Sequence, residues 1–586
     1  MTSPTQTPSR ALGWLLALPA LVGALITLII PTVQTIVLSF ETGRIAGPSR
    51  FVGLDNYGQL VGDAAFWRAL GFSLSLSLAP LLVTVVVGPL LALALDRAGA
   101  WPRRAGRIVL SLAIVTFSPV AVAAAWLQGL RPDASGVVVL AEGLRDPATA
   151  PGALRLVIAA ATFGVLCALA VTAFLPTLRG GTVTASVLAV GALLVLATLA
   201  VALQAFSVGL AMTQGGPNGS TDTVASLQYS LAFRDFKLGL GAAMATASGV
   251  LVGVLGVVAT IVAAVSGLRI TLTPRPAPDP GSRVAQPAYG QAAPPLVPGQ
   301  AGAFEQAGSA SSPAHGQVSA PADAPPAPQP SARRVSTGNV LVGVAALGVV
   351  AVVALLLAWP WLSALFAAKQ PVTGAPSTLR TQVNTWVPAV IGALISVGTA
   401  YLAALGIGGL RPLGRHSEWL LLPFAPWLFA GFGPLSLADW QMLRGMGLVD
   451  TFLALIPPLL VSVPAMLVLT LLCKGLAERT DRDFLSGVVL RSLPMAGILA
   501  GAVALMNGQD LLWPLLAAQE HDLATAPVSL MQQLMGFRQA SPDVGVATPL
   551  VVVVVALAAT VAAQLLYLDR LAITAGNGSR SARAAA

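Results

Sequence analysis

The stretch LGLGAAMATASGVLVGVLGVVATIVAAVS, residues 238–266, contains no charged residue and no proline. A helix needs roughly 20 apolar residues to cross a bilayer core about 30 Å thick, so this stretch is long enough to span a membrane. Similar runs recur along the chain, and 56% of its 586 residues are hydrophobic whereas only 9% are charged. A soluble fold could not bury that much apolar surface. The solvent is therefore lipid, and the uninterrupted runs favour helices over the short alternating strands of a membrane barrel.

Twelve such runs predict an all-α polytopic membrane protein with about twelve transmembrane helices. We expect the first six spans at 11–39, 67–95, 107–130, 153–178, 184–212 and 238–266. We expect the second six at 339–366, 383–408, 418–438, 451–474, 490–518 and 547–568. The first run has no evident small-residue cleavage site before Glu41 and is longer than a signal-peptide core, so we interpret it as a retained span.

Composition divides the chain into two halves. Residues 271–338 are rich in Pro, Ala, Gly, Ser and Gln, as in PAPDPGSRVAQPAYGQAAPPLVPGQ (276–300), and cannot build a core. We expect a disordered cytoplasmic linker there, between a first half (1–270) and a second half (339–586) of six spans each. Both halves would start on the same side of the membrane, as parallel repeats.

Weak internal repetition supports this division. Five residues between the fifth and sixth spans of the first half recur at the same place in the second, with one residue inserted. They are Ser226, Leu227, Leu231, Phe233 and Arg234, which recur as Ser529, Leu530, Leu534, Phe537 and Arg538.

The basic residues indicate the orientation. With the amino terminus inside, Lys and Arg concentrate in the segments on the inner side, as the positive-inside rule requires. We therefore expect both termini in the cytoplasm and the chain in the cell (plasma or inner) membrane. The net charge of +9 follows from this topology, so it gives no reason to invoke nucleic acid as a partner.

The sequence shows no motif for nucleotide hydrolysis and suggests no thiolate metal site. Its only lysines are Lys237, Lys369 and Lys474, and none stands in a phosphate-binding Walker A loop. We expect no enzyme activity, no catalytic residue and no cofactor in this chain, so any ATPase that works with it would be a separate chain. The two cysteines, Cys167 and Cys473, lie in or at the ends of predicted spans and are interpreted as apolar fillers, with no metal site.

Ionisable residues are nearly missing from the centres of the predicted spans. Asp96, Asp450, Asp510 and Asp569 lie at span ends, which argues against an internal proton relay. One loop instead favours a secondary carrier. Its residues Asp96, Arg97, Gly99, Arg103 and Arg104 resemble the Asp-Arg-x-Gly-Arg-Arg loop of the major facilitator superfamily, although the arginines are displaced and Ala92 replaces the leading glycine. We prefer to interpret it as an ordinary positive-inside loop.

Several short phrases in the first half resemble another family. They are FVGLDNY (51–57), FWRAL (66–70) and TQGGP (213–217). Their order and placement are similar to those of the larger membrane subunit of maltose-type carbohydrate ABC importers. The second half resembles the smaller subunit through GLVDT (447–451), NGQDLLWPL (507–515), TAPVSL (525–530) and LAITAG (571–576).

The resemblance implies the two membrane subunits of a type I ABC importer permease, fused in one chain. It further implies as partners two copies of an ABC ATPase subunit, an extracytoplasmic solute-binding protein and a carbohydrate substrate, with membrane lipid around the chain. Two hypotheses remain beside it. One is an ATP-independent twelve-helix secondary carrier of the major facilitator type, and the other is a diverged, non-transporting permease-like membrane protein.

The chain departs from this family where the ATPases dock. The family uses a loop after the fourth span with a Glu-Ala-Ala, Gly and Leu-Pro pattern. In the first half only Leu175-Pro176 matches, and in the second half the pattern is shortened and lacks the triplet. An ordinary solvated loop remains an alternative for each. Our candidate coupling residues are Pro176, Arg179, Glu478, Asp481, Asp483, Gly487, Arg491 and Pro494.

No motif assigns the substrate pathway. A sugar site needs hydrogen-bonding side chains and aromatic faces near the middle of the membrane. The candidates by depth and residue type are Trp126, Gln128, Gln204, Tyr401, Asn507, Gln509 and Trp513. Each could instead form an interhelical hydrogen bond or belong to an interfacial aromatic belt.

Overall fold

The computed structural model describes residues 10–43, 49–180, 182–273, 336–366, 377–479, 483–536 and 543–576. Met1–Thr273 and Ser336–Ala586 form one compact unit. The predicted linker at 271–338 lies outside the described residues except at its two ends. Within the described ranges, nine helices are long and apolar enough to cross a membrane, or eleven if each of two bent pairs is one span. The prediction of an all-α multi-pass membrane protein is confirmed in this outline.

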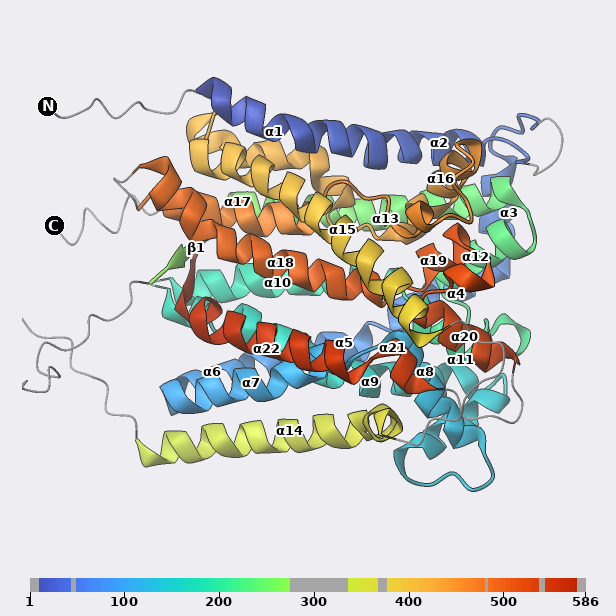
Figure 1. The fold of residues 1–586 in the computed structure, drawn as a ribbon, viewed down its shortest axis with the longest axis horizontal. Helices are drawn as coiled ribbons and strands as arrows, with labels where there is room; N and C mark the ends of the chain where they lie inside the picture. Colours follow the sequence, from blue (N-terminus) through green and yellow to red (C-terminus); the bar gives the residue numbers. More distant parts are fainter. Residues whose placement is uncertain are drawn as a thin grey trace, which may run out of the picture. The chain divides into compact units, whose positions relative to one another are not determined.

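The elements of the first half are long helices joined by short helical turns (Figure 1). They are α1 (Arg10–Ala24), η1 (Leu25–Ile29), α2 (Ile30–Ser39), α3 (Asp55–Gly62), α4 (Ala64–Ser75), α5 (Leu78–Leu82), η2 (Val83–Val87), α6 (Gly88–Ala98), α7 (Ala100–Thr116), α8 (Pro119–Trp126), η3 (Leu127–Leu130), η4 (Gly136–Arg145), α9 (Ala150–Phe174), η5 (Thr177–Arg179), α10 (Val183–Leu203), α11 (Ser207–Thr213), η6 (Pro217–Gly219), α12 (Val224–Tyr229), η7 (Ser230–Arg234), α13 (Leu238–Val265) and β1 (Arg269–Leu272).

The second half repeats this pattern of long helices and short turns. Its elements are α14 (Thr337–Leu365), α15 (Thr378–Ala404), η9 (Leu405–Leu410), η10 (Gly414–Trp427), α16 (Phe432–Gly445), η11 (Phe452–Leu455), α17 (Val463–Ala477), η12 (Leu485–Val489), α18 (Leu490–Gly508), α19 (Leu512–Ala517), η13 (His521–Leu523), α20 (Ala526–Gly536), α21 (Val544–Ala547), α22 (Leu550–Leu566), η14 (Leu568–Arg570) and β2 (Leu571–Thr574).

Nine of the twelve predicted spans correspond to continuous apolar helices, and the other three differ. The tenth is short, because only the 15 residues of α17 are helical after an irregular stretch. The third is broken between α7 and α8 with a bend of 78°, and the ninth between η10 and α16 with a bend of 74°. Pro119 accounts for the first break, because a residue before proline favours an extended backbone and Ser118 is extended there.

The opening helix of each half packs on the other half. α1 lies against α15 and η9, whereas α14 lies against α6, α7 and α9. Figure 1 shows α14 beside α6 and α7. Small residues allow both approaches, since a Cβ on Gly343 would collide with Ala98 and one on Gly406 would collide with the backbone of Gly13. The two halves are thereby interlocked.

A two-stranded antiparallel sheet, which the sequence did not predict, joins the ends of the two halves. β1 follows the last helix of the first half, and β2 follows the last helix of the second. The segments RITLT (269–273) and RLAIT (570–574) pair so that Thr271 faces Ala572 at the centre. If each segment is numbered from its arginine, position 3 of one segment faces position 3 of the other, and position 2 faces position 4. The two segments therefore pair at equivalent positions, as two related copies would.

The recurring residues of the two halves lie in corresponding short helices. Ser226, Leu227 and Leu231 belong to α12 and η7, and Ser529, Leu530 and Leu534 belong to α20. Phe537 and Arg538 lie outside the described residues. Cys167 and Cys473 are buried thiols in the main hydrophobic core, which draws side chains from both halves.

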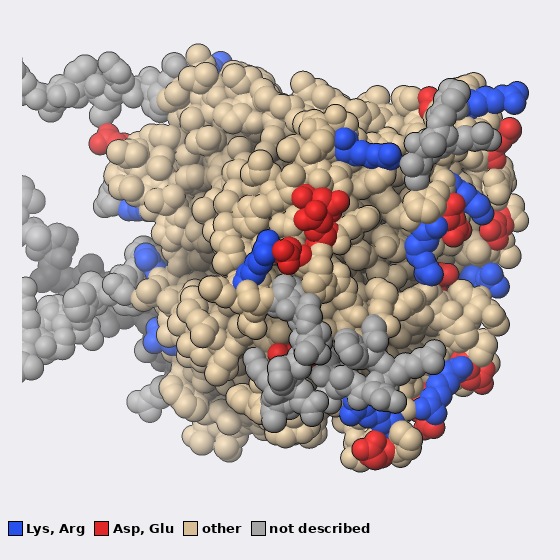
Figure 2. All heavy atoms as spheres, turned by 45° about the vertical axis from the view of Figure 1, so that its right-hand side comes forward, with Lys and Arg blue, Asp and Glu red and all other residues tan. Residues whose placement is uncertain are grey.

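The surface is largely apolar, as expected of a membrane protein. Many large hydrophobic side chains of α1, α14 and α22 are exposed, and in Figure 2 the charged side chains lie mainly across the centre and the right-hand end of the view, with a few at its left edge. We call the end where β1 and β2 lie, at the left of Figure 1, the sheet end.

Candidate functional site

A glutamine from the first half forms hydrogen bonds with the backbone at the break in the ninth span. Gln204 caps the end of α10, and its Nε2 donates to the carbonyl oxygen of Phe429 at 2.8 Å. Its Oε1 accepts from the backbone N–H of Gly431 at 2.7 Å. A broken membrane helix is tolerated only where its freed backbone groups find partners. Gln204, predicted as a substrate contact, therefore braces the break in this conformation.

A second glutamine supports the same bent span. Gln228, on α12, donates from Nε2 to the carbonyl oxygen of Gly433 at 2.6 Å and lies 3.4 Å from Ser436 Oγ. Beside it, the rings of Phe233 and Trp440 meet edge to face at 5.7 Å. The short helices α12 and η7 of the first half thus each contribute a side-chain contact to α16 of the second half.

The broken third span has a corresponding environment. Its limb α8 packs against α11 of its own half and against α20 of the second half. In the same way, α16 packs against α19 of its own half. Trp126 ends α8 and is fully buried, and its Nε1 has no hydrogen-bond partner among the described residues. Gln128 is half-buried in η3. Discontinuous spans at corresponding positions of two halves are a pointer to a transport site.

Asp439, on α16, is an acidic residue that the sequence interpretation missed. Its side chain is 1% exposed, and within the described ranges neither carboxyl oxygen has a hydrogen-bond partner. α16 packs against α2, α13 and α19, none of which contains a charged residue. An intramembrane carboxyl without a partner is a functional-site candidate by default. It was missed because the predicted ninth span ended at residue 438.

A cavity of about 400 Å³ lies along this bent span. Its walls come from α2, α13 and the two limbs on either side of the break. The cavity is mostly apolar, and the hydroxyls of Thr32, Thr35 and Thr246 donate to backbone carbonyls of their own helical segments. Trp427 Nε1 donates to Thr32 Oγ at 3.0 Å. In this conformation the cavity offers a sugar few free hydrogen-bonding groups.

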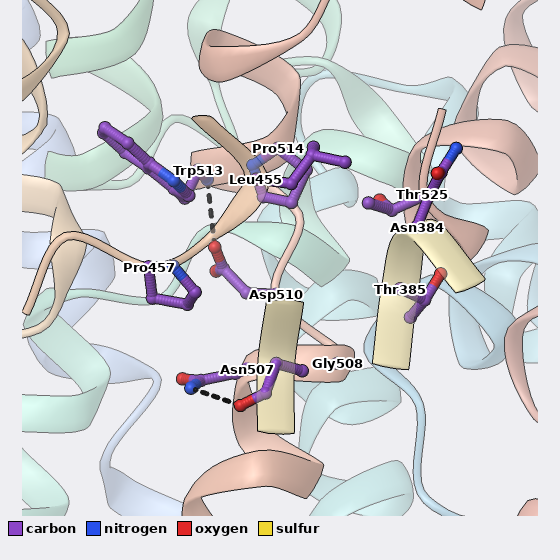
Figure 3. A pocket seen from close by; sticks show the side chains of 11 residues that line it. Asn384, Thr385, Leu455, Pro457, Asn507, Gly508, Asp510, Trp513, Pro514 and Thr525 are labelled. Atoms are coloured by element: carbon purple, nitrogen blue, oxygen red, sulfur yellow. Dashed lines mark hydrogen bonds between the residues drawn. The ribbon is translucent and has the colours of Figure 1, made fainter. Parts of the chain in front are cut away.

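A smaller, polar pocket lies near the end of α18 (Figure 3). Its volume is about 10 Å³, which is room for about one water molecule. Asp510 accepts a hydrogen bond from the backbone N–H of Trp513 at 2.9 Å, and Asn507 Nδ2 donates to the carbonyl oxygen of Ala389 at 3.3 Å. Other polar lining residues are Asn384, Thr385 and Thr525. Sequence reasoning identified Asn507 and Trp513 here but missed those three, which no motif marks.

The remaining pathway candidates make structural contacts elsewhere. Tyr401 OH donates to the carbonyl oxygen of Val489 at 2.8 Å, and Gln509 Nε2 donates to the carbonyl oxygen of Ala547 at 3.1 Å. Trp513 is 1% exposed and stacks on Phe432 with its ring centroid 6.2 Å away. Of the seven candidates, only Asn507 and Trp513 share a pocket. The structure does not gather the others around one cavity.

At the sheet end, the turn after the fourth span of the first half contacts the end of the second half. The carbonyl oxygen of Pro176 accepts from Ile573 N at 2.9 Å, and Arg179 Nη2 lies 3.0 Å from Asp569 Oδ1. The second half makes the reciprocal contact. Glu478 pairs with Arg269 at 2.8 Å and with Arg411 at 2.7 Å. The two contacts correspond in place but have opposite charge polarity.

Much of the second predicted coupling segment is helical. Gly487 is buried in η12, and Arg491 and Pro494 lie in α18. Asp483 is exposed just before these helices, whereas Asp481 lies outside the described residues. Of the predicted coupling residues from 481 to 494, the structure therefore places only Asp483 in an exposed position outside a helix.

Comparison with known proteins gave no assignment. No protein-family model matches the chain, and no curated protein matches it.

Proposed function

We propose that the chain is the membrane permease of a binding-protein-dependent ABC transporter that imports a carbohydrate. In this proposal two six-span halves enclose the pathway, and two separate ATPase subunits, which bind ATP and Mg²⁺, dock at the sheet end in the cytoplasm. An extracytoplasmic binding protein delivers the sugar at the other end.

The importer and its substrate class rest on the sequence resemblance, and the observation that supports a fused pair of related halves is the register of β1 and β2. A register that pairs equivalent positions at the carboxyl ends of the halves is what a fused pair of related subunits would form. The exchanged packing of α1 and α14 and the matching breaks in the third and ninth spans support the same symmetry.

The same features suggest how the permease would work. Alternating access needs two arrangements of the halves, with partner binding biasing one over the other. The turn at Arg179 is tied to the second half, and Glu478 is tied to the first. A force applied to either turn would therefore act across the boundary between the halves. The ninth span, which Gln204 and Gln228 brace, and the broken third span are the segments best placed to rearrange around a passing sugar.

The energy source of uptake tests this proposal. We expect cells that produce the chain together with its proposed ATPase and binding-protein partners to accumulate a labelled sugar in an ATP-dependent manner. Accumulation should survive a protonophore when cellular ATP is maintained. Uptake that collapses with the proton gradient while ATP stays high would contradict the importer.

Asp439 supports the alternative of a secondary carrier. Its buried carboxyl has no hydrogen-bond partner among the described residues and could bind a coupling proton or cation. In that case Asp439→Asn would abolish gradient-driven uptake. The non-transporting alternative draws on the poorly matched coupling segments and predicts no uptake under either energy source.

A further inference from the structure

Four arginines surround one carboxylate at the sheet end. Arg103, Arg104 and Arg107 come from α7, and Arg179 comes from η5. Their nitrogens lie between 3.0 and 3.5 Å from the carboxylate oxygens of Asp569. We call these four side chains the arginine cluster.

The arginine cluster carries more positive charge than its neighbours neutralise. Besides Asp569, its only ion-pair partner among the described residues is Asp96, 3.5 Å from Arg103. Four arginines against two carboxylates leave an excess of two positive charges. Arg107 is 2% exposed, and its Nε has no hydrogen-bond partner in the described part of the chain. Asp569 and Asp96 offset only half of this charge, so the cluster favours binding of a further anion.

The cluster opens beside a surface that faces lipid. Arg104 is 57% exposed. Trp101 and Leu112 lie on the same stripe of α7, three residues before it and eight after it, and they are 71% and 39% exposed. An exposed tryptophan at the end of a membrane helix is typical of the lipid headgroup level. The stripe therefore runs from a cationic site at the membrane surface to an apolar wall at the depth of acyl chains.

We propose that the arginine cluster binds the phosphate group of an anionic membrane phospholipid, whose acyl chains lie along the exposed stripe of α7. Guanidinium groups pair with phosphate oxygens through two parallel hydrogen bonds, and basic pockets at helix ends are known sites for anionic headgroups. The adjoining apolar stripe favours a lipid over free phosphate, because only a lipid would use both parts of the site. This site is independent of the transported substrate.

The test compares lipid retention by three forms of the full-length protein. Each is purified in mild detergent, offered equal amounts of phosphatidylglycerol and phosphatidylcholine, and analysed by native mass spectrometry. The wild type should retain phosphatidylglycerol preferentially. Arg104→Gln should lower that preference about fivefold, because it removes one of the guanidinium groups that would contact the phosphate directly. Arg97→Gln is the control. Arg97 is exposed at the end of α6, next to the start of α7, and it forms no ion pair among the described residues.

Thermal unfolding distinguishes a lipid site from a free-anion site and from a purely structural ion pair. Phosphatidylglycerol should raise the unfolding temperature of the wild type and of Arg97→Gln, but raise that of Arg104→Gln less. An equal rise with inorganic phosphate alone would assign the site to a free anion and overturn the proposal. If Arg104→Gln were destabilised equally in both lipids with unchanged retention, the cluster would be a structural ion pair only, and the proposal would again fail.

Discussion

Replacing Gln204 with leucine tests whether the break in the ninth span depends on the first half. The change removes the hydrogen bonds at 2.8 Å to Phe429 and at 2.7 Å from Gly431, and leaves both backbone groups without that partner. Hydrogen bonds between membrane helices average about 0.6 kcal/mol and reach about 1.7. Two of them predict a loss of about 1–3 kcal/mol in the free energy of unfolding.

Denaturant unfolding in lipid nanodiscs measures this loss, with Gln59→Leu as the control. Gln59 is exposed on α3, so its replacement should change the free energy of unfolding by less than about 0.5 kcal/mol. Gln228→Leu should resemble Gln204→Leu, and the double variant should deviate from additivity because both side chains hold one break.

The same variant should loosen the break locally. A cysteine introduced at Ala430, half-buried beside the break, should react faster with a small maleimide in the Gln204→Leu background. Cys167 and Cys473 are both buried and should contribute little to the reaction. Equal stability and equal labelling rates in Gln204→Leu and Gln59→Leu would refute the role of Gln204 as a brace.

Three further predictions concern other contacts. Asp439→Leu should raise the free energy of unfolding by about 1–3 kcal/mol in the same assay, because it removes a buried carboxyl that has no hydrogen-bond partner among the described residues. Unchanged or lower stability would argue that another group satisfies this carboxyl. Arg269→Gln and Glu478→Gln should each weaken the sheet end, and the double variant should lose less than the sum of the two. We expect a coupling of about 0.2–1 kcal/mol in this double-mutant cycle, since both side chains are about a quarter exposed, and zero coupling would count against the contact. Trp126→Phe should lower the free energy of unfolding only slightly, because Trp126 Nε1 has no hydrogen-bond partner among the described residues. Trp126→Ala should lower it by about 3–5 kcal/mol. A large loss of stability in the phenylalanine variant would indicate that Nε1 does form a hydrogen bond.

The sequence predicted the long helices well because lipid imposes one strong constraint on them. A continuous run such as 238–266 has to satisfy its backbone within the helix, and α13 covers almost the same residues. Hydropathy could not place the bends, since apolar residues continue through Ser118 and through 428–431. Nor could it predict β1 and β2, because each strand has four residues and its partner lies about 300 positions away in the chain.

The site was harder to predict than the fold. Residue type correctly drew attention to Gln204 and Asn507, but side-chain amides serve helix packing as readily as sugar binding. Gln204 proved to bridge two halves more than 200 residues apart, a contact that depends on tertiary structure alone. Asp439 escaped notice because a span boundary drawn one residue too early made a buried carboxyl resemble a loop residue.

Affinity purification of the tagged chain from its native membrane, followed by quantitative mass spectrometry, tests the central claim most directly. The account predicts an ABC ATPase at about two copies per chain. Its recovery should fall when residues 479–484, between α17 and η12, are replaced by a Gly/Ser segment that leaves both helices intact. Recovery of no ATPase, even after crosslinking, would contradict an ATP-driven importer and favour a carrier or a non-transporting protein.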